Sequence, residues 1–214
     1  MGNIIDFKNE LSEVLKGEKP AGEAHKKIMR DRLPIKDFGS KIKQARKAAV
    51  LLLLYPNKGK LHTVFILRSE YEGVHSSQIA LPGGAVENID NSLVDTALRE
   101  ANEEISLPRS QVEVLGNLSP LYVPPSNFVI QPYIGIQYKS SQFIPNPIEV
   151  ASIIEYPVEN LIGEDKVIDK EVDVRGNNLL VKGYNLGEYF MWGATAMIVK
   201  EFAEIMSKLQ YPTI

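Results

Sequence analysis

The feature that most constrains the fold is a double glycine, Gly83-Gly84, followed by the run Arg99-Glu100-Ala101-Asn102-Glu103-Glu104. We expect one helix over Leu93–Ile105, with Asp90 or Ser92 as its capping residue. Apolar residues repeat along this segment at helical spacing and form one stripe: Val94, Leu98, Ala101 and Ile105. The helix therefore needs a hydrophobic core along one side.

Three carboxylates, those of Glu100, Glu103 and Glu104, fall on roughly the opposite side of this helix. A like-charge pair four residues apart, such as Glu100 and Glu104, costs a helix roughly 0.2–0.5 kcal/mol, and only Arg99 is near enough to offset it. Clustered carboxylates suit a hard divalent cation such as Mg²⁺, which is typically shared with substrate phosphates. The backbone at Gly84 can approach a ligand closely and can add a carbonyl ligand to the metal. The alternative is a solvated acidic helix face.

This stretch resembles the Nudix box, whose pattern is Gly, five residues, Glu, seven residues, Arg-Glu, an aliphatic residue, any residue, Glu-Glu, any residue, Gly and an aliphatic residue. The positions that fit are Gly84, Arg99, Glu100, Ala101, Glu103, Glu104 and Leu107. The front half is one residue longer, with Asp90 near the place of the first Glu, and Ser106 replaces the last Gly. The longer spacing is typical of the coenzyme A pyrophosphatase branch, and we expect Ser106 to affect only how the helix ends.

A second motif before the box resembles the same branch, whose members carry Arg-Ser, Arg, His, Gly-Gln and aromatic-Pro-Gly-Gly. The matching residues are Arg68, Ser69, His75, Gln78, Pro82, Gly83 and Gly84. The departures are Gly73 for the second Arg, Ser77 for a Gly and Leu81 for Phe. Because guanidinium groups suit phosphates, the change at Gly73 bears on the substrate.

The resemblance implies that the substrate-binding residues are Arg68, Ser69, His75, Gln78 and Gly83. We interpret His75 as a positioning residue rather than a metal ligand, because Mg²⁺ prefers oxygen. The alternative for Arg68 is a surface salt bridge.

Glu149 stands at the start of an expected strand and resembles the family's acidic residue at this place. It is expected to approach the metal cluster from across the site; the alternative is a surface carboxylate. Further on, Tyr189 to Ala196 resembles the aromatic-x-Trp-Gly-x-Thr-Ala segment before the family's last helix, with Trp192 expected in the core.

The remaining chain predicts strands on both sides of the box helix and a closing helix, which is typical of an α/β (α+β) fold. The resemblance makes this a Nudix-type α/β/α sandwich with a mixed β-sheet. We expect a hairpin of Ala48–Tyr55 with Leu61–Leu67, and further strands over Val112–Leu118, Pro132–Tyr138 and Asn178–Lys182, the last paired with the Tyr184–Phe190 region. Leu121–Gln131 is expected to be a loop because of its prolines.

Residues 1–38 predict an N-terminal helical arm, and residues 39–214 the Nudix hydrolase domain. A first helix carries Ile4, Phe7 and Leu11 at helical spacing, and a second is expected over Gly22–Asp31. The arm is expected to pack against the domain; a homodimer contact is the alternative.

The composition of the chain limits which partners and which cellular compartment we expect. The chain has 214 residues, a net charge of −3 and no cysteine, so we expect no disulfide, no nucleic-acid partner and no membrane partner. No signal peptide is visible, and a cytoplasmic location is expected.

The resemblance implies metal-dependent hydrolysis, with Mg²⁺ or Mn²⁺, of a diphosphate bond in a small nucleotide substrate. Glu100 and Glu104 would hold the metal, Glu103 would be a third ligand or the base, Glu149 the rival base, and Arg99 would orient Glu103. The branch implies coenzyme A or acyl-coenzyme A, cleaved to 3′,5′-adenosine bisphosphate and 4′-phosphopantetheine. One alternative is the same chemistry on ADP-ribose, a dinucleotide or a nucleotide sugar. An alternative of another class is a nucleotide-binding module without hydrolysis.

Overall fold

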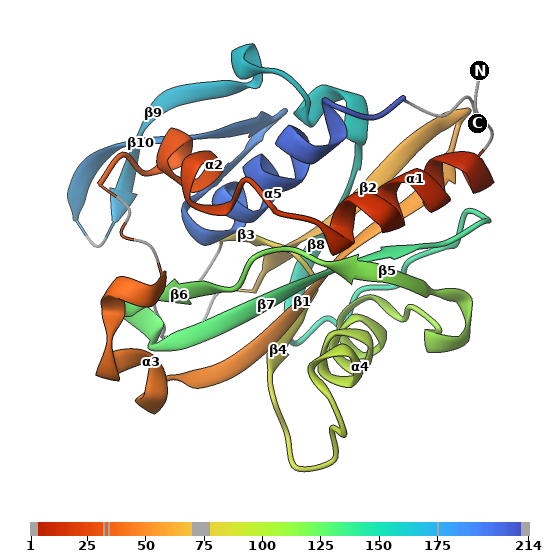
Figure 1. The fold of residues 1–214 in the computed structure, drawn as a ribbon, viewed down its shortest axis with the longest axis horizontal. Coiled ribbons are helices and arrows are strands. Elements are labelled where there is room, and N and C mark those ends of the chain that lie inside the picture. The colour runs from red at the N-terminus through yellow and green to blue at the C-terminus, as the bar shows by residue number, and fades with distance from the viewer. Residues whose placement is uncertain (1–3, 32, 34, 70–77, 175, 211–214) are drawn as a thin grey trace.

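The computed structural model describes residues 4–31, 33, 35–69, 78–174 and 176–210 (Figure 1). Three residues of the upstream motif, Gly73, His75 and Ser77, lie outside the described residues. The helices are α1 (Ile4–Lys16), α2 (Ala21–Ile28), α3 (Ser40–Gln44), α4 (Leu93–Ile105) and α5 (Gly193–Met206). The strands are β1 (Arg46–Asn57), β2 (Lys60–Arg68), β3 (Ile79–Ala80), β4 (Gly83–Ala85), β5 (Glu113–Asn117), β6 (Leu121–Val123), β7 (Phe128–Ile136), β8 (Val150–Pro157), β9 (Val167–Val174), β10 (Asn177–Leu186) and β11 (Tyr189–Trp192).

Strand β1 is the centre of the larger, mixed sheet. It pairs in parallel with β7, from Arg46 opposite Phe128 to Leu54 opposite Ile136. It pairs antiparallel with β4 along its first half and with β2 at its end, which confirms the predicted hairpin. The sheet order is β3-β2-β1-β7-β5, with β8 on β2 and β6 on β7, while β9, β10 and β11 form a second sheet.

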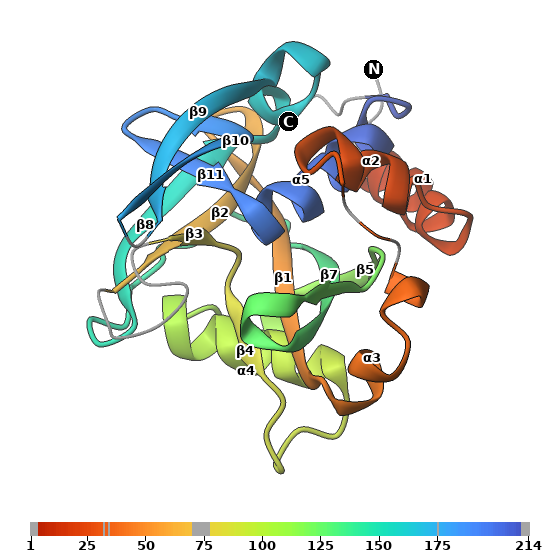
Figure 2. The ribbon, with the colours of Figure 1, turned by 90° about the vertical axis from the view of Figure 1, so that its left-hand side faces the viewer.

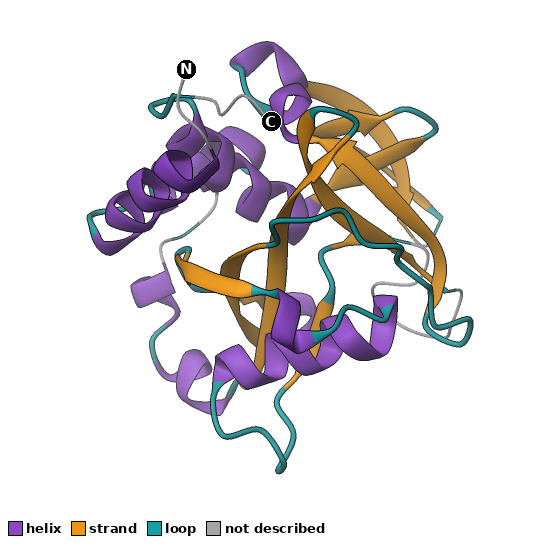
Figure 3. Ribbon diagram, turned by 90° about the vertical axis from the view of Figure 1, so that its right-hand side faces the viewer, coloured by secondary structure: helices purple, strands orange, loops and turns teal. Residues whose placement is uncertain are grey.

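Both faces of β1 are covered, as its continuous apolar run predicts. Leu52 and Leu54 pack in one core with residues of α1 and α5, whereas Leu51 and Leu53 pack in another with residues of α4. Because successive side chains of a strand point to opposite faces, this alternation places α4 on one side of the sheet and α1 and α5 on the other (Figures 2 and 3). The α/β/α sandwich with a mixed sheet is confirmed.

The N-terminal arm packs against the domain. Helix α1 buries Phe7, Leu11 and Leu15 in the core that α5 also lines. A Cβ at Gly116 in β5 would lie 2.9 Å from the Cβ of Leu15, so the glycine allows α1 to approach this strand. The homodimer contact and the domain boundary at residue 38 stay predictions. Among the described residues, no helix is long and apolar enough to cross a bilayer.

Helix α2 joins α5 through one buried and one exposed polar contact. The His25 ring nitrogen Nε2 lies 3.1 Å from the Glu201 carboxylate, and both side chains are buried. The Lys27 ammonium donates to Glu204 at 2.7 Å. The helix ends at Ile28 rather than at Asp31, because Met29 already has extended backbone angles.

Two other predictions were wrong. The expected loop Leu121–Gln131 is mostly strand, because β6 and β7 pair on either side of a short turn at Pro124–Ser126 that Asn127 ends in a left-handed conformation, with φ 52°. Tyr184 belongs to β10 itself, whose partners are β9 and β11. Gly183 does not break this strand, because its missing side chain leaves room for the Met191 carbonyl, which a Cβ would meet at 2.1 Å.

Candidate active site

Helix α4 has the predicted bounds and the predicted apolar face. The hydroxyl of Ser92, rather than the carboxylate of Asp90, caps it by accepting the Asp95 N–H at 3.1 Å. The predicted stripe packs into the core on β1, with Leu98, Ala101 and Ile105 buried. Ser106 ends the helix in the left-handed region, with φ 55°, where the family pattern has glycine. The substitution thus affects the helix end, as expected.

The double glycine brings the backbone of β4 against α4. Gly83 has φ 152°, and a Cβ there would lie 2.3 Å from the Ala49 carbonyl oxygen of β1, so only glycine fits this position. A Cβ on Gly84 would lie 2.6 Å from the carboxylate oxygens of Glu100. The bare backbone of Gly84 therefore forms one wall directly beside an acidic group of the helix.

A cavity of about 380 Å³ lies beside this wall. Three carboxylates (Glu100, Glu104 and Glu149) line it together with Arg68, Ser69, Ile148 and the backbone segment Gly83–Ala85. The three acidic groups come from α4 and from the residue just before β8, and Arg68 ends β2. Residues from four separate parts of the chain thus meet in one polar pocket.

Glu104 is buried, with 1% of its side chain exposed, so the alternative of a solvated acidic face does not hold for this residue. Its Oε2 accepts the N–H of Gly83 at 2.8 Å, and its Oε1 lies 3.5 Å from Arg68 Nη1. Burial raises the pKa of Glu104 to about 8; the Gly83 and Arg68 contacts oppose this, and the charges of Glu100 and Glu149 add to it. Arg68 thus lines the pocket and contacts a buried carboxylate, and its role in substrate binding stays a prediction.

Burial also raises the pKa of Glu100, and the Arg99 guanidinium opposes that shift. The ionised form of crowded, partly desolvated carboxylates is strongly stabilised when a cation binds between them. Among the residues that the structure describes, no three acidic or histidine side chains already form a complete metal-binding group. Mg²⁺ is commonly held by one or two carboxylates together with waters and phosphates, so Glu100, Glu104 and the Gly84 carbonyl fit that donor set.

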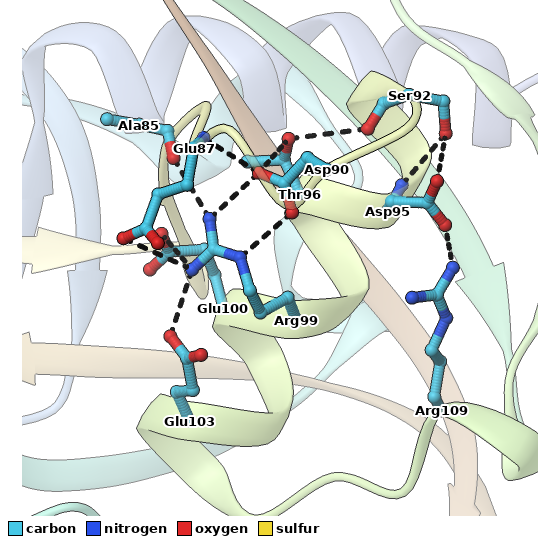
Figure 4. A network of polar contacts seen from close by, with 10 residues as sticks. All are labelled: Ala85, Glu87, Asp90, Ser92, Asp95, Thr96, Arg99, Glu100, Glu103 and Arg109. Carbon is cyan, nitrogen blue, oxygen red and sulfur yellow. Dashed lines mark hydrogen bonds and ion pairs between the residues drawn. The ribbon is translucent and has the colours of Figure 1, made fainter.

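Arg99 is the hub of the polar network shown in Figure 4. Its Nε donates to Asp90 Oδ1 at 2.9 Å and its Nη2 to Asp90 Oδ2 at 3.0 Å, while Nη1 donates to Glu100 and Glu103, each at 2.9 Å. Hydrogen bonds from Arg99 hold the pKa of Asp90 well below its ordinary value. Glu103 points toward Arg99, with 51% of its side chain exposed, and does not line the pocket.

The structure describes only part of the upstream motif, including Arg68, Ser69 and Gln78. Ser69 lines the pocket, and its N–H donates to the Glu149 carbonyl at 2.9 Å. The Gln78 carbonyl accepts the Arg68 N–H at 3.1 Å, which holds the end of β2 against the chain entering β3. The prediction for the His75 side chain is not tested, because it lies outside the described residues.

Sequence reasoning missed two pocket residues, Ala85 and Ile148, and the way the segment of Ile148 reaches the helix. The Asn146 N–H donates to the Glu104 carbonyl at 2.9 Å and the Ile144 N–H to the Ile105 carbonyl at 3.1 Å. These bonds bring residues 144–149 over the end of α4. The available signal was an isoleucine directly before the acidic Glu149.

Comparison with known proteins assigns the chain to a family. The pattern described as the NUDIX domain matches residues 45–172. The chain belongs to the Nudix hydrolase family. The protein named "Uncharacterized Nudix hydrolase NudL" of Pectobacterium atrosepticum is 35% identical over 166 residues, which are 76% of this chain and 83% of the relative. The protein of the same name from Klebsiella pneumoniae is 36% identical over 160 residues, which are 74% of this chain and 81% of the relative.

Solved structures share the fold of this Nudix hydrolase. The Nudix hydrolase RenU of M. smegmatis has a TM-score of 0.54 at 18% identity, covering 78% of this chain and 88% of that one. An Ap4A hydrolase binary complex of C. elegans has a TM-score of 0.52 at 13% identity, covering 77% and 99%. Nudix hydrolases generally use divalent cations such as Mg²⁺ or Mn²⁺.

Proposed function

We propose that this Nudix hydrolase cleaves the diphosphate bond of coenzyme A or acyl-coenzyme A to 3′,5′-adenosine bisphosphate and 4′-phosphopantetheine. The observation that carries the proposal is the pocket in which Glu100, Glu104 and Glu149 face Arg68 beside a glycine wall. Carboxylates that take a cation and a guanidinium that takes a phosphate are the two groups that a diphosphate requires. The Arg-Ser and Pro-Gly-Gly motifs support the coenzyme A branch.

Each pocket residue has a role in this proposal. Glu100, Glu104 and the Gly84 carbonyl would hold Mg²⁺ or Mn²⁺, which would supply positive charge for the diphosphate and make water a better nucleophile. Arg68 binds a phosphate oxygen, and Ser69 and Gly83 shape the wall beside it. Gly83 also fixes Glu104 through its backbone N–H, while the need for glycine there comes from its φ of 152° and its close approach to the Ala49 carbonyl.

Two glutamates compete for the role of general base. Glu149 lines the pocket, whereas Glu103 is held by Arg99 and half exposed. These positions favour Glu149 as the group that takes the proton from the attacking water. In this scheme Arg99, bound to Asp90, orients Glu100 and holds Glu103 away from the pocket.

Two alternatives remain from the sequence. Hydrolysis of ADP-ribose, a dinucleotide or a nucleotide sugar is favoured by Gly73, which stands where the branch has an arginine. A binding module without hydrolysis is opposed by the presence of Glu100, Glu103 and Glu104, of which Glu100 and Glu104 line the pocket.

Product analysis by mass spectrometry tests the proposal. Coenzyme A and ADP-ribose are incubated separately with the protein and Mg²⁺ or Mn²⁺, with a chelator as control. Metal-dependent release of 4′-phosphopantetheine is the expected result. Cleavage of ADP-ribose alone would move the assignment to the first alternative. The Glu104→Gln variant, whose amide oxygen can still accept the Gly83 N–H, should fold normally and lose turnover; equal activity would reject the site.

A further inference from the structure

Ile148 is an apolar side chain presented to solvent inside a charged pocket. It is 83% exposed, the highest value for a large hydrophobic residue in the described part of the chain. It lines the cavity directly before Glu149, and apart from the methyl group of Ala85 the other side chains there are polar or charged. Because its side chain is so exposed, Ile148 contributes little to the core.

The segment that carries Ile148 is tied down on both sides. The Ile148 N–H donates to Asn146 Oδ1 at 3.1 Å, and the Val150 N–H donates to the Asn146 carbonyl at 2.8 Å. Asn146 in turn donates its own N–H to the carbonyl of Glu104 in α4. Ile148 therefore has a fixed place relative to the acidic residues, which is what a specificity contact needs.

We propose that Ile148 binds an apolar group attached directly to the diphosphate, so that the enzyme selects diphosphates with a compact branched alkyl group over those with a hydroxylated sugar. Covering an exposed isoleucine with an alkyl group removes apolar surface of both partners from water. This inference rests on the proposed function and deepens it. Coenzyme A has such a group, because a dimethyl-substituted carbon lies beside its diphosphate, whereas ADP-ribose has a sugar at that place.

The test uses two analogues of ADP whose phosphorus atoms are joined by a methylene group, so that they cannot be cleaved. One carries a neopentyl ester and the other a methyl ester on the outer phosphorus, and their affinities are measured by titration calorimetry with Mg²⁺. Wild-type protein is expected to bind the neopentyl compound about five- to tenfold more tightly. Ile148→Ser should bind both equally, and Ile148→Leu should restore the preference.

Ile144→Ser is the matched control. Ile144 lies in the same segment and is 57% exposed, but it does not line the pocket. Its substitution should leave the preference unchanged. The inference is overturned if wild-type protein binds the two analogues equally, if it binds neither, or if Ile144→Ser removes the preference as Ile148→Ser does. Hydrolysis of the corresponding oxygen-bridged esters is measured in parallel. Binding with an Ile148-dependent preference but no cleavage would reject the proposed hydrolysis alone.

Discussion

Replacing Gly84 by alanine should damage the site while leaving the fold intact. Gly84 has a negative φ, so alanine introduces no left-handed strain. Its methyl group would lie 2.6 Å from the Glu100 carboxylate, where ordinary contact begins at 3.4 Å. The carboxylate at the far end of a flexible side chain must therefore retreat by roughly 0.8 Å, and a misplacement of about 1 Å in a catalytic site can cost about 100-fold in rate.

We expect Gly84→Ala to lower kcat/KM on coenzyme A by about 100-fold and to weaken Mn²⁺ binding, while the free energy of unfolding in urea changes by less than about 1 kcal/mol. Manganese binding by electron paramagnetic resonance gives a readout independent of turnover. Gly22→Ala in α2 is the control, because a Cβ there meets nothing within 4 Å. Wild-type turnover and metal affinity in Gly84→Ala would refute the argument that Glu100 must stand against a bare backbone.

Three further predictions concern charged groups. Asp90→Asn should lower the free energy of unfolding by about 2–3 kcal/mol in urea titrations, because it breaks a buried pair with Arg99, although Arg99 keeps ion pairs with three other carboxylates. Glu149→Gln should reduce kcat more than Glu103→Gln, and the reverse order in steady-state kinetics would make Glu103 the base. Burial opposes the lowering of the Glu204 pKa, yet lysine contacts bring it to about 2 from 4.5. The stabilisation from the ionised Glu204 is therefore present above pH 4.5 and is lost as the pH falls toward 2. In melting curves, the melting temperature of the wild type should exceed that of Glu204→Gln above pH 4.5, and the difference should disappear between pH 4.5 and 2.

The box helix could be predicted from sequence because its determinants are local. Its cap, its apolar stripe and its end lie within a few residues of one another, and the predicted bounds Leu93–Ile105 agree with the structure. The alternation of β1 between two cores also follows from an apolar run long enough to need cover on both faces.

The burial of Glu104 could not be predicted in this way. Helical geometry gives the direction of a side chain but not what a distant segment places beside it, and here Gly83 and Arg68 contact the carboxylate while residues 144–149 bond to the backbone at the helix end. The same reason explains why Ile148 was missed. The expected loop at Leu121–Gln131 failed because its prolines occupy only the short turn, and the flanking residues pair in the sheet.

The parallel ladder between β1 and β7 has a consequence for how the protein is made. Partners such as Val50 and Pro132 are far apart in the chain, and helix α4 lies between them, so the ladder closes a long loop before its contacts stabilise it. The pocket also needs Arg68 and Glu149, which lie on either side of that helix in sequence. A nascent chain that has emerged only through α4 thus carries the acidic helix without a complete pocket, and the pocket can form only after Glu149 has been synthesised and β8 has joined β2.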